Sequence, residues 1–193
     1  MITHSPYPEF QSSYRQNLST KKALVKVTND TLRKINYKEV TLLVMLDLNA
    51  VFDTVNLNIL PTRLNEEIGT SGVALEWFKS YLANRGQRVS INGSLSESFS
   101  LDCGVPQMSC LGPLLFILYS STIFTVVEAQ LPHKHFEADN TQIYLSFKPN
   151  SSISKSAIRE MKCCIEKIRR WLIQDRLLVN DDKNEFMVIG TRQ

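Results

Sequence analysis

The stretch LLVMLDLNAVF, residues 42 to 52, opens with apolar side chains only and then reaches an acid, Asp47. A short run that is apolar at every position predicts a β-strand covered on both faces. A carboxylate at the end of such a strand is unfavourable unless a metal ion, a basic partner or solvent at the sheet rim offsets its charge. A second acid, Asp139, lies between two further strand-like segments. Two carboxylates on adjacent strand ends are what a two-metal phosphoryl-transfer site requires, whereas a solvated strand end is the alternative.

The composition is that of one globular domain of ordinary size. The chain has 193 residues, 43% of them hydrophobic and 21% charged, which is sufficient for a core. No run approaches the roughly 20 apolar residues of a membrane span, and the polar start MITHSPYPEFQSSYRQ is not a secretory signal. We therefore expect an intracellular protein, cytoplasmic or nuclear, with no membrane partner.

Basic residues gather in two segments, although the formal net charge is only +3. One segment lies within the first forty residues and the other near the C-terminus. They comprise Lys21, Lys22, Lys26, Arg33, Lys34 and Lys38, and then Lys155, Arg159, Lys162, Lys167, Arg169, Arg170 and Arg176. Such clusters are typical of solvated helix faces and also of nucleic-acid grooves. Composition alone does not choose between the two.

The four cysteines, Cys103, Cys110, Cys163 and Cys164, do not have the spacing of a zinc site. No paired histidines lie near them in the sequence. We expect four reduced thiols, as in proteins of a reducing compartment.

The hydrophobic pattern predicts helices and strands in alternation. Helices are expected at 19–35 (with Ser19 or Thr20 as the cap), 59–68, 72–82, 114–127 and 154–173. Strands are expected at 40–46 and 186–189, and hairpins at 87–101, around Asn92-Gly93, and at 131–147. The last helix carries an apolar stripe of Ile158, Met161, Ile165, Ile168, Trp171 and Leu172. These elements predict the α+β class, with a largely antiparallel sheet and helices on one face.

Five segments together resemble the reverse transcriptase domain of non-LTR (LINE-type) retrotransposons. In order, they are LLVMLDLNAVFDTV, WFKSYLANRGQRVSINGSLS, GVPQMSCLGPLLFILYS, HFEADNTQIYLSF and LLVNDDKNEFMVIGT. The resemblance implies a right-hand polymerase palm, an antiparallel sheet backed by helices. It implies a tail at 1–11 and a reverse transcriptase domain at 12–193, with partial fingers at about 12–38, a palm at about 39–193 and no thumb.

The resemblance also implies a catalytic centre. Asp47 and Asp139 would bind two Mg²⁺ ions, which suit a site of few carboxylates and substrate phosphate oxygens. Lys183 matches a lysine thought to assist the leaving group, although by itself it is an ordinary surface lysine. The implied partners are an RNA template, a DNA primer and a deoxynucleoside triphosphate.

Three further residues match positions of the family that contact the nucleotide. Phe52 would close against the sugar 2′ position and select deoxynucleotides, although without the motif it is an ordinary core aromatic. Gln107 would line the nucleotide pocket. Arg15 lies in a segment resembling the fingers, where basic residues meet the triphosphate.

The sequence departs from the family pattern inside its own motifs. Asn140 stands where the family has a second aspartate, so the metal site loses one charge. Glu137 replaces an aromatic residue before it. Met108 replaces a glycine, which would allow close backbone approach and unrestricted φ, and Val51 replaces a smaller residue. Clustered at one site, these changes predict a copy that has lost activity.

Three hypotheses follow. The first is the palm of an RNA-directed DNA polymerase with two-metal nucleotidyl transfer, in a catalytically defective copy. The second is a non-catalytic remnant of this fold that at most binds nucleic acid. The third is an ordinary α+β domain whose acids are turn and cap residues.

Overall fold

The structure, a computed structural model, describes residues 19–106, 108–128, 133–137 and 140–191. The chain forms two compact units. Unit 1 combines residues 1–49 with residues 120–193, and unit 2 comprises residues 50–119. Because the boundary falls inside the stretch 42–52, Asp47 belongs to unit 1 and Phe52 to unit 2.

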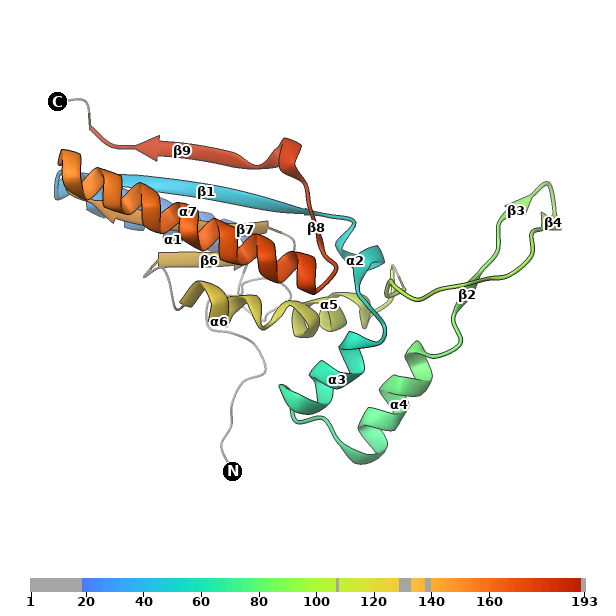
Figure 1. The fold of residues 1–193 in the computed structure, drawn as a ribbon. Coiled ribbons are helices and arrows are strands. Elements are labelled where there is room, and N and C mark those ends of the chain that lie inside the picture. The colour runs from blue at the N-terminus through green and yellow to red at the C-terminus, as the bar shows by residue number, and fades with distance from the viewer. Residues whose placement is uncertain (1–18, 107, 129–132, 138–139, 192–193) are drawn as a thin grey trace. The chain divides into compact units, whose positions relative to one another are not determined.

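Unit 1 contains a five-stranded antiparallel sheet (Figure 1). Its strands are β1 (Val40–Asn49), β6 (His133–Glu137), β7 (Asn140–Phe147), β8 (Leu178–Val179) and β9 (Glu185–Ile189). On one edge of β1, β7 pairs from Val40 opposite Phe147 to Asp47 opposite Asn140. The other edge is shared by β9 and β8. β6 pairs with β7, which confirms the predicted second hairpin.

The described helical segments of unit 1 are α1 (Thr20–Asn36), α6 (Ile123–Glu128), α7 (Ser151–Gln174) and the short 3-10 helix η1 (Asp181–Lys183). Two of them, α1 and α7, begin close to their predicted positions. The Ser19 side chain accepts a hydrogen bond from the Lys22 N–H, which confirms the predicted cap of α1. Because the Asn150 side chain accepts from the Ser152 N–H, α7 begins earlier than predicted.

Helices pack on both faces of the sheet. Residues 42–44 and 46 of β1 are buried, as the apolar run predicts. Leu43 packs with Val27 of α1 and Tyr144 of β7, so α1 covers one face, and α7 lies across the other (Figure 1). The expectation of helices on a single face is wrong, because a strand buried on both sides needs cover on both.

The buried stripe of α7 contains small residues that the predicted stripe omitted. The stripe consists of Ala157, Met161, Cys164, Ile168, Trp171 and Leu172. Ile158, which was predicted to belong to it, is 43% exposed. Buried positions separated by three and four residues form one helical face. Helical geometry therefore places Ala157 and Cys164 inside despite their small size.

The predicted helix at 114–127 is wrong, because the structure has two helices there, α5 (Gly112–Ser120) and α6. Hydroxyl side chains at the break compete with the helix for backbone groups. The Thr125 Oγ1 donates to the Thr122 carbonyl at 2.7 Å. The Thr122 hydroxyl in turn accepts from Trp171 Nε1 of α7 at 3.1 Å, so a contact with a distant helix fixes the break.

Unit 2 is mainly helical. It contains α2 (Val51–Thr54), α3 (Ile59–Glu66), α4 (Gly72–Leu82) and most of α5. The bounds of α4 are those predicted, and α3 ends before Gly69, whose φ of +76° suits a glycine. The large, fully buried side chains of unit 2 are Val55, Leu60, Leu64, Leu115, Phe116, Ile117 and Tyr119. The core of unit 2 therefore forms around the apolar helix α5.

The predicted first hairpin is confirmed, but its arms are interrupted. β3 (Ser90–Ile91) pairs with β4 (Ser94–Leu95), and β2 (Gly86–Gln87) pairs with β5 (Phe99–Ser100). Asn92 and Gly93 both have positive φ, 50° and 82°, which is typical of a tight hairpin turn.

Two expectations about the whole chain can be compared with the described residues. Cys103, Cys110, Cys163 and Cys164 are free thiols in the structure. No helix in the described ranges has the length and apolar character needed to cross a membrane.

Candidate active site

Asp47 lies on the central strand of unit 1, beside the strand that begins at Asn140. The register of β1 and β7 places Asp47 opposite Asn140. Asp139, which precedes Asn140 in the sequence, lies outside the described residues, as do Arg15 and Gln107. The strand was expected to end at Asp47, but β1 continues to Asn49. The carboxylate is 18% exposed, so it is largely covered without being sealed from solvent.

The turn between β8 and β9 surrounds this carboxylate with polar groups. Lys183 Nζ lies 3.7 Å from Asp47 Oδ2, and the Asn180 side-chain amide donates to the same oxygen at 3.3 Å. The structure thus brings together Asp47 and Lys183, two of the predicted site residues. The Lys183 side chain is 70% exposed, so its ion pair with Asp47 is weak and easily exchanged.

Asp47 also lines an open hollow of about 380 Å³. The other residues that line this hollow are Met45, Asp182, Lys183 and Glu185. Three carboxylates and one ammonium therefore face a common space. Within the described ranges, however, no three side chains of His, Cys, Asp or Glu are grouped closely enough to hold a metal ion. A metal site here would need a ligand from outside those ranges, such as the predicted Asp139.

Phe52 lies in unit 2 and has a half-buried side chain. Its ring meets Phe116 edge to face, with centroids 5.7 Å apart. The Val105 N–H donates to the Phe52 carbonyl at 2.7 Å, which ties Val105 to α2. Part of the Phe52 side chain thus packs in the core, as expected of an ordinary core aromatic. Its contact with a nucleotide stays a prediction.

The two departures in unit 2 have different surroundings. Val51 is buried, so its added bulk is accommodated in the core. Met108 is fully exposed and has a φ of 62°, a left-handed conformation that glycine adopts far more easily. The backbone conformation at this position therefore favours the glycine of the family. The side chains of Glu137 and Asn140 lie outside the described set.

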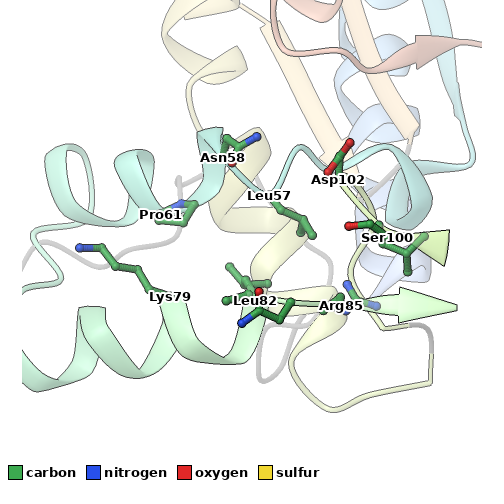
Figure 2. A pocket seen from close by; sticks show the side chains of 11 residues that line it. Leu57, Asn58, Pro61, Lys79, Leu82, Arg85, Ser100 and Asp102 are labelled. Carbon is green, nitrogen blue, oxygen red and sulfur yellow. The ribbon is translucent and has the colours of Figure 1, made fainter. Parts of the chain in front are cut away.

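A second hollow, of about 360 Å³, lies within unit 2 between α3, α4 and the base of the hairpin (Figure 2). Its cations are already engaged: Lys79 pairs with Glu76 at 2.8 Å, and Arg85 donates to the Gly104 carbonyl. Asp102 adds an opposing charge. Because this hollow contains none of the predicted site residues, the Asp47 hollow is the better candidate for chemistry.

Sequence reasoning missed two asparagines of the site, Asn180 and Asn184. Both contact Asp47, Asn184 through the Asp47 backbone N–H at 3.1 Å. The available signal was the polar run NDDKN between two apolar segments, which is also the ordinary composition of a loop. The basic residues of α1 and α7 are exposed, apart from a partly covered Lys34.

Comparison with known proteins gives a consistent result. Residues 1–192 match the family described as reverse transcriptase (RNA-dependent DNA polymerase). A Drosophila melanogaster protein described as a probable RNA-directed DNA polymerase from transposon X-element is 33% identical over 113 residues, 58% of this chain and 12% of that protein. The RNA-directed DNA polymerase from mobile element jockey, also of Drosophila melanogaster, is 29% identical over 126 residues, 61% of this chain and 13% of its own length. The chain thus spans a small part of these relatives, and the likeness to LINE-type elements is confirmed.

Solved structures of other proteins share the fold of this chain. Apo telomerase from Candida tropicalis, truncated from its C-terminal domain, superposes with a TM-score of 0.69 at 16% identity, over 95% of this chain and 37% of that one. Candida albicans telomerase in complex with a fragment of telomeric RNA gives 0.65 at 15% identity, over 94% and 32%. The predicted α+β class is confirmed at this level. With a family match along almost its whole length, the chain belongs to the reverse transcriptase (RNA-dependent DNA polymerase) family.

Proposed function

We propose that this chain is the palm, with part of the fingers, of an RNA-directed DNA polymerase whose catalysis is impaired in this copy. The palm would comprise about residues 39–193 and the partial fingers about 12–38. The register that sets Asp47 opposite Asn140 carries the proposal, because Asp139 directly precedes Asn140 in the sequence. Strand pairing is the arrangement by which two carboxylates distant in sequence come to share one site.

Asp47 has an oxygen available for a metal ion. Its described side-chain contacts, with Asn180 and Lys183, both fall on Oδ2. Oδ1 accepts no hydrogen bond from the described residues, and a hard oxygen of this kind is what Mg²⁺ prefers. Asp47 and Asp139 would hold two Mg²⁺ ions. When bound, these ions would supply charge stabilisation for nucleotidyl transfer.

The remaining predicted residues would act on the substrate. Lys183 is exposed enough to leave Asp47 and approach the leaving pyrophosphate. Phe52 would meet the sugar and Gln107 the nucleotide, while Arg15 would meet the triphosphate. An RNA template, a DNA primer and a deoxynucleoside triphosphate would be the substrates. Asn140 would weaken metal binding through its lost charge, and Met108 would disturb the turn beside Gln107.

Binding of Mn²⁺, a paramagnetic substitute for Mg²⁺, tests the metal site directly. We expect Asn140→Asp to tighten Mn²⁺ binding about tenfold, since it restores a negative charge at short range. Asp47→Ala in that background should abolish the gain. Asp182→Asn removes a charge from the same hollow, but Asp182 is not a proposed ligand, so it should retain most of the affinity. Mn²⁺ affinity that is unchanged by Asp47→Ala would refute the metal site.

Primer extension on an RNA template with Mg²⁺ tests the reaction. We expect the natural chain to incorporate no more nucleotide than its Asp47→Ala variant. The combination of Asn140→Asp with Met108→Gly should give extension that depends on Asp47. Extension by the natural chain well above the Asp47→Ala control would show that the copy is not impaired.

A second candidate function is favoured by the exposed basic residues of α7. Lys155, Arg159, Lys162, Lys167 and Arg170 are all exposed on this helix. A non-catalytic remnant would bind nucleic acid through such a surface, and its affinity would fall steeply with salt. A flat salt response of single-stranded RNA binding would remove this candidate.

A further inference from the structure

On the edge of β1 that faces away from β7, Asn180 and Asn184 take the place of a strand partner beside Asp47. β9 pairs with β1 as far as Met45 opposite Glu185, and β8 resumes the pairing with Leu48 opposite Val179. Residues 46 and 47 of β1 therefore face the five-residue turn 180–184 instead of a strand. Interruptions of this kind re-aim side chains and are common beside active sites.

The turn satisfies the backbone of Asp47 that a strand would otherwise pair. The Asn180 N–H donates to the Asp47 carbonyl at 2.9 Å. The Asp47 N–H donates to the side-chain oxygen of Asn184 at 3.1 Å, so a side chain stands in for the missing backbone acceptor. The Asn180 side chain completes the set by donating to Asp47 Oδ2 at 3.3 Å.

The turn itself is anchored to α7. The Asn184 side-chain nitrogen donates to Asp181 Oδ1 at 3.1 Å, and the guanidinium of Arg169 on α7 pairs with the same oxygen. The two hydrogen bonds of Asn184 support the same orientation of its amide: the oxygen faces the Asp47 N–H, which only donates, and the nitrogen faces the Asp181 carboxylate, which only accepts. A continuous chain of contacts thus runs from Arg169 through Asp181 and Asn184 to Asp47.

We infer that Asn180 and Asn184 are positioning residues that hold the Asp47 carboxylate with Oδ2 engaged and Oδ1 presented to a metal ion. The inference deepens the proposed function and rests on it for the identity of the ligand. Side chains that hold a metal ligand in place affect metal affinity without touching the metal. Arg169 and Asp181 contribute by fixing the turn.

Amide hydrogen exchange of the full chain tests the positioning contacts without any metal. Asn184→Ala should speed exchange at the Asp47 amide about tenfold, because one hydrogen bond is lost. Asn150→Ala is the matched control: it removes another hydrogen-bonding asparagine of unit 1, the cap of α7, and should leave the Asp47 amide unchanged. Equal exchange at Asp47 in the two variants would overturn the inference.

Mn²⁺ binding then tests the consequence for the metal. In the Asn140→Asp background, Asn180→Ala should weaken Mn²⁺ binding about tenfold, and Asn150→Ala should not. Unchanged affinity with Asn180→Ala, in a protein whose binding still requires Asp47, would overturn the positioning role. If Mn²⁺ binding does not require Asp47 at all while Asn184→Ala still speeds exchange, the contacts stand and the proposed metal function fails.

Discussion

The two units hold their predicted site residues by different means. In unit 1, backbone pairing along β1 fixes Asp47 against β7 on one side and against the β8–β9 turn on the other. In unit 2, strands are only two residues long, and Phe52 is held by packing against Phe116 and by loop hydrogen bonds. Unit 1 therefore depends on a hydrogen-bonded ladder, and unit 2 on the side chains around α5.

The same difference between the units distinguishes two departures from the family pattern, Asn140 in unit 1 and Met108 in unit 2. Asn140 pairs in register with Asp47, so the change from aspartate removes charge without disturbing the ladder. Met108 lies at a position that requires a positive φ, so the change from glycine adds conformational strain. The ladder tolerates side-chain replacement, whereas a turn depends on the identity of its residue.

The largest effect should come from the core of unit 2. Phe116 is fully buried, so Phe116→Ala should lower the free energy of unfolding by about 3–5 kcal/mol. Because unit 2 depends on packing, hydrogen exchange should show its helices opening while β1 and β7 keep most of their protection. Phe99→Ala is the control, since Phe99 is 60% exposed in the same unit. Equal loss of protection in β1 would mean that the two units unfold together.

The elements that the sequence predicts well are those with local causes. The burial of 42–44 follows from continuous apolar residues, and the start of α1 follows from Ser19. The turn at Asn92-Gly93 follows from residues that adopt positive φ. Each of these features is decided by neighbours in the chain, so a single sequence suffices.

The failures have long-range causes. The break between α5 and α6 depends on Thr122 meeting Trp171, a contact between residues far apart in the chain. The roles of Asn180 and Asn184 depend on β1 and appear in the sequence as an ordinary polar loop. For the candidate site, the resemblance supplied Asp47 and Lys183, but the groups that hold Asp47 come from a distant part of the chain and are seen only in the folded structure.

A smaller effect is expected in unit 1, where the contact between β7 and α1 should make stability depend on pH. The Tyr144 hydroxyl donates to Asp30 Oδ2 of α1 at 2.8 Å. Burial, and then the hydrogen bond and the charge of Asp30, raise the pKa of Tyr144 above its ordinary value. The neutral phenol thus stabilises the fold fully below about pH 10, the ordinary pKa of tyrosine, and the contribution declines as pH rises above it.

Tyr144→Phe should remove this alkaline dependence and lower stability at neutral pH by about 1–2 kcal/mol, through the lost hydrogen bond. Urea unfolding at neutral and alkaline pH measures both quantities. Tyr37→Phe is the matched control, because Tyr37 and Tyr144 both line a hollow of about 270 Å³ in unit 1, but Tyr37 is 72% exposed. The same alkaline loss in wild type and Tyr144→Phe would assign the dependence to other groups.

The smallest effect should be a gain, at the turn in unit 2. The Ser109 N–H lies 3.4 Å from the Pro106 carbonyl, and Met108 occupies the third position of this turn with a φ of 62°. Turns that need a positive φ at the third position favour glycine there. The Ser109 hydroxyl, which donates to Pro106 O and accepts from the Gly112 N–H, holds the turn independently of Met108. Relieving the strain should therefore keep the turn and stabilise it.

Met108→Gly should raise the free energy of unfolding by about 0.5–1 kcal/mol, since the strain relieved exceeds the added freedom of the unfolded chain. Met108→Ala removes the same exposed side chain but keeps a Cβ, so it should give no gain. A matching gain with alanine would mean that the methionine side chain, not the backbone, is the unfavourable feature. A gain with glycine but not with alanine would show that Met108 strains the backbone of unit 2. This strain could then be relieved separately from the charge lost at Asn140.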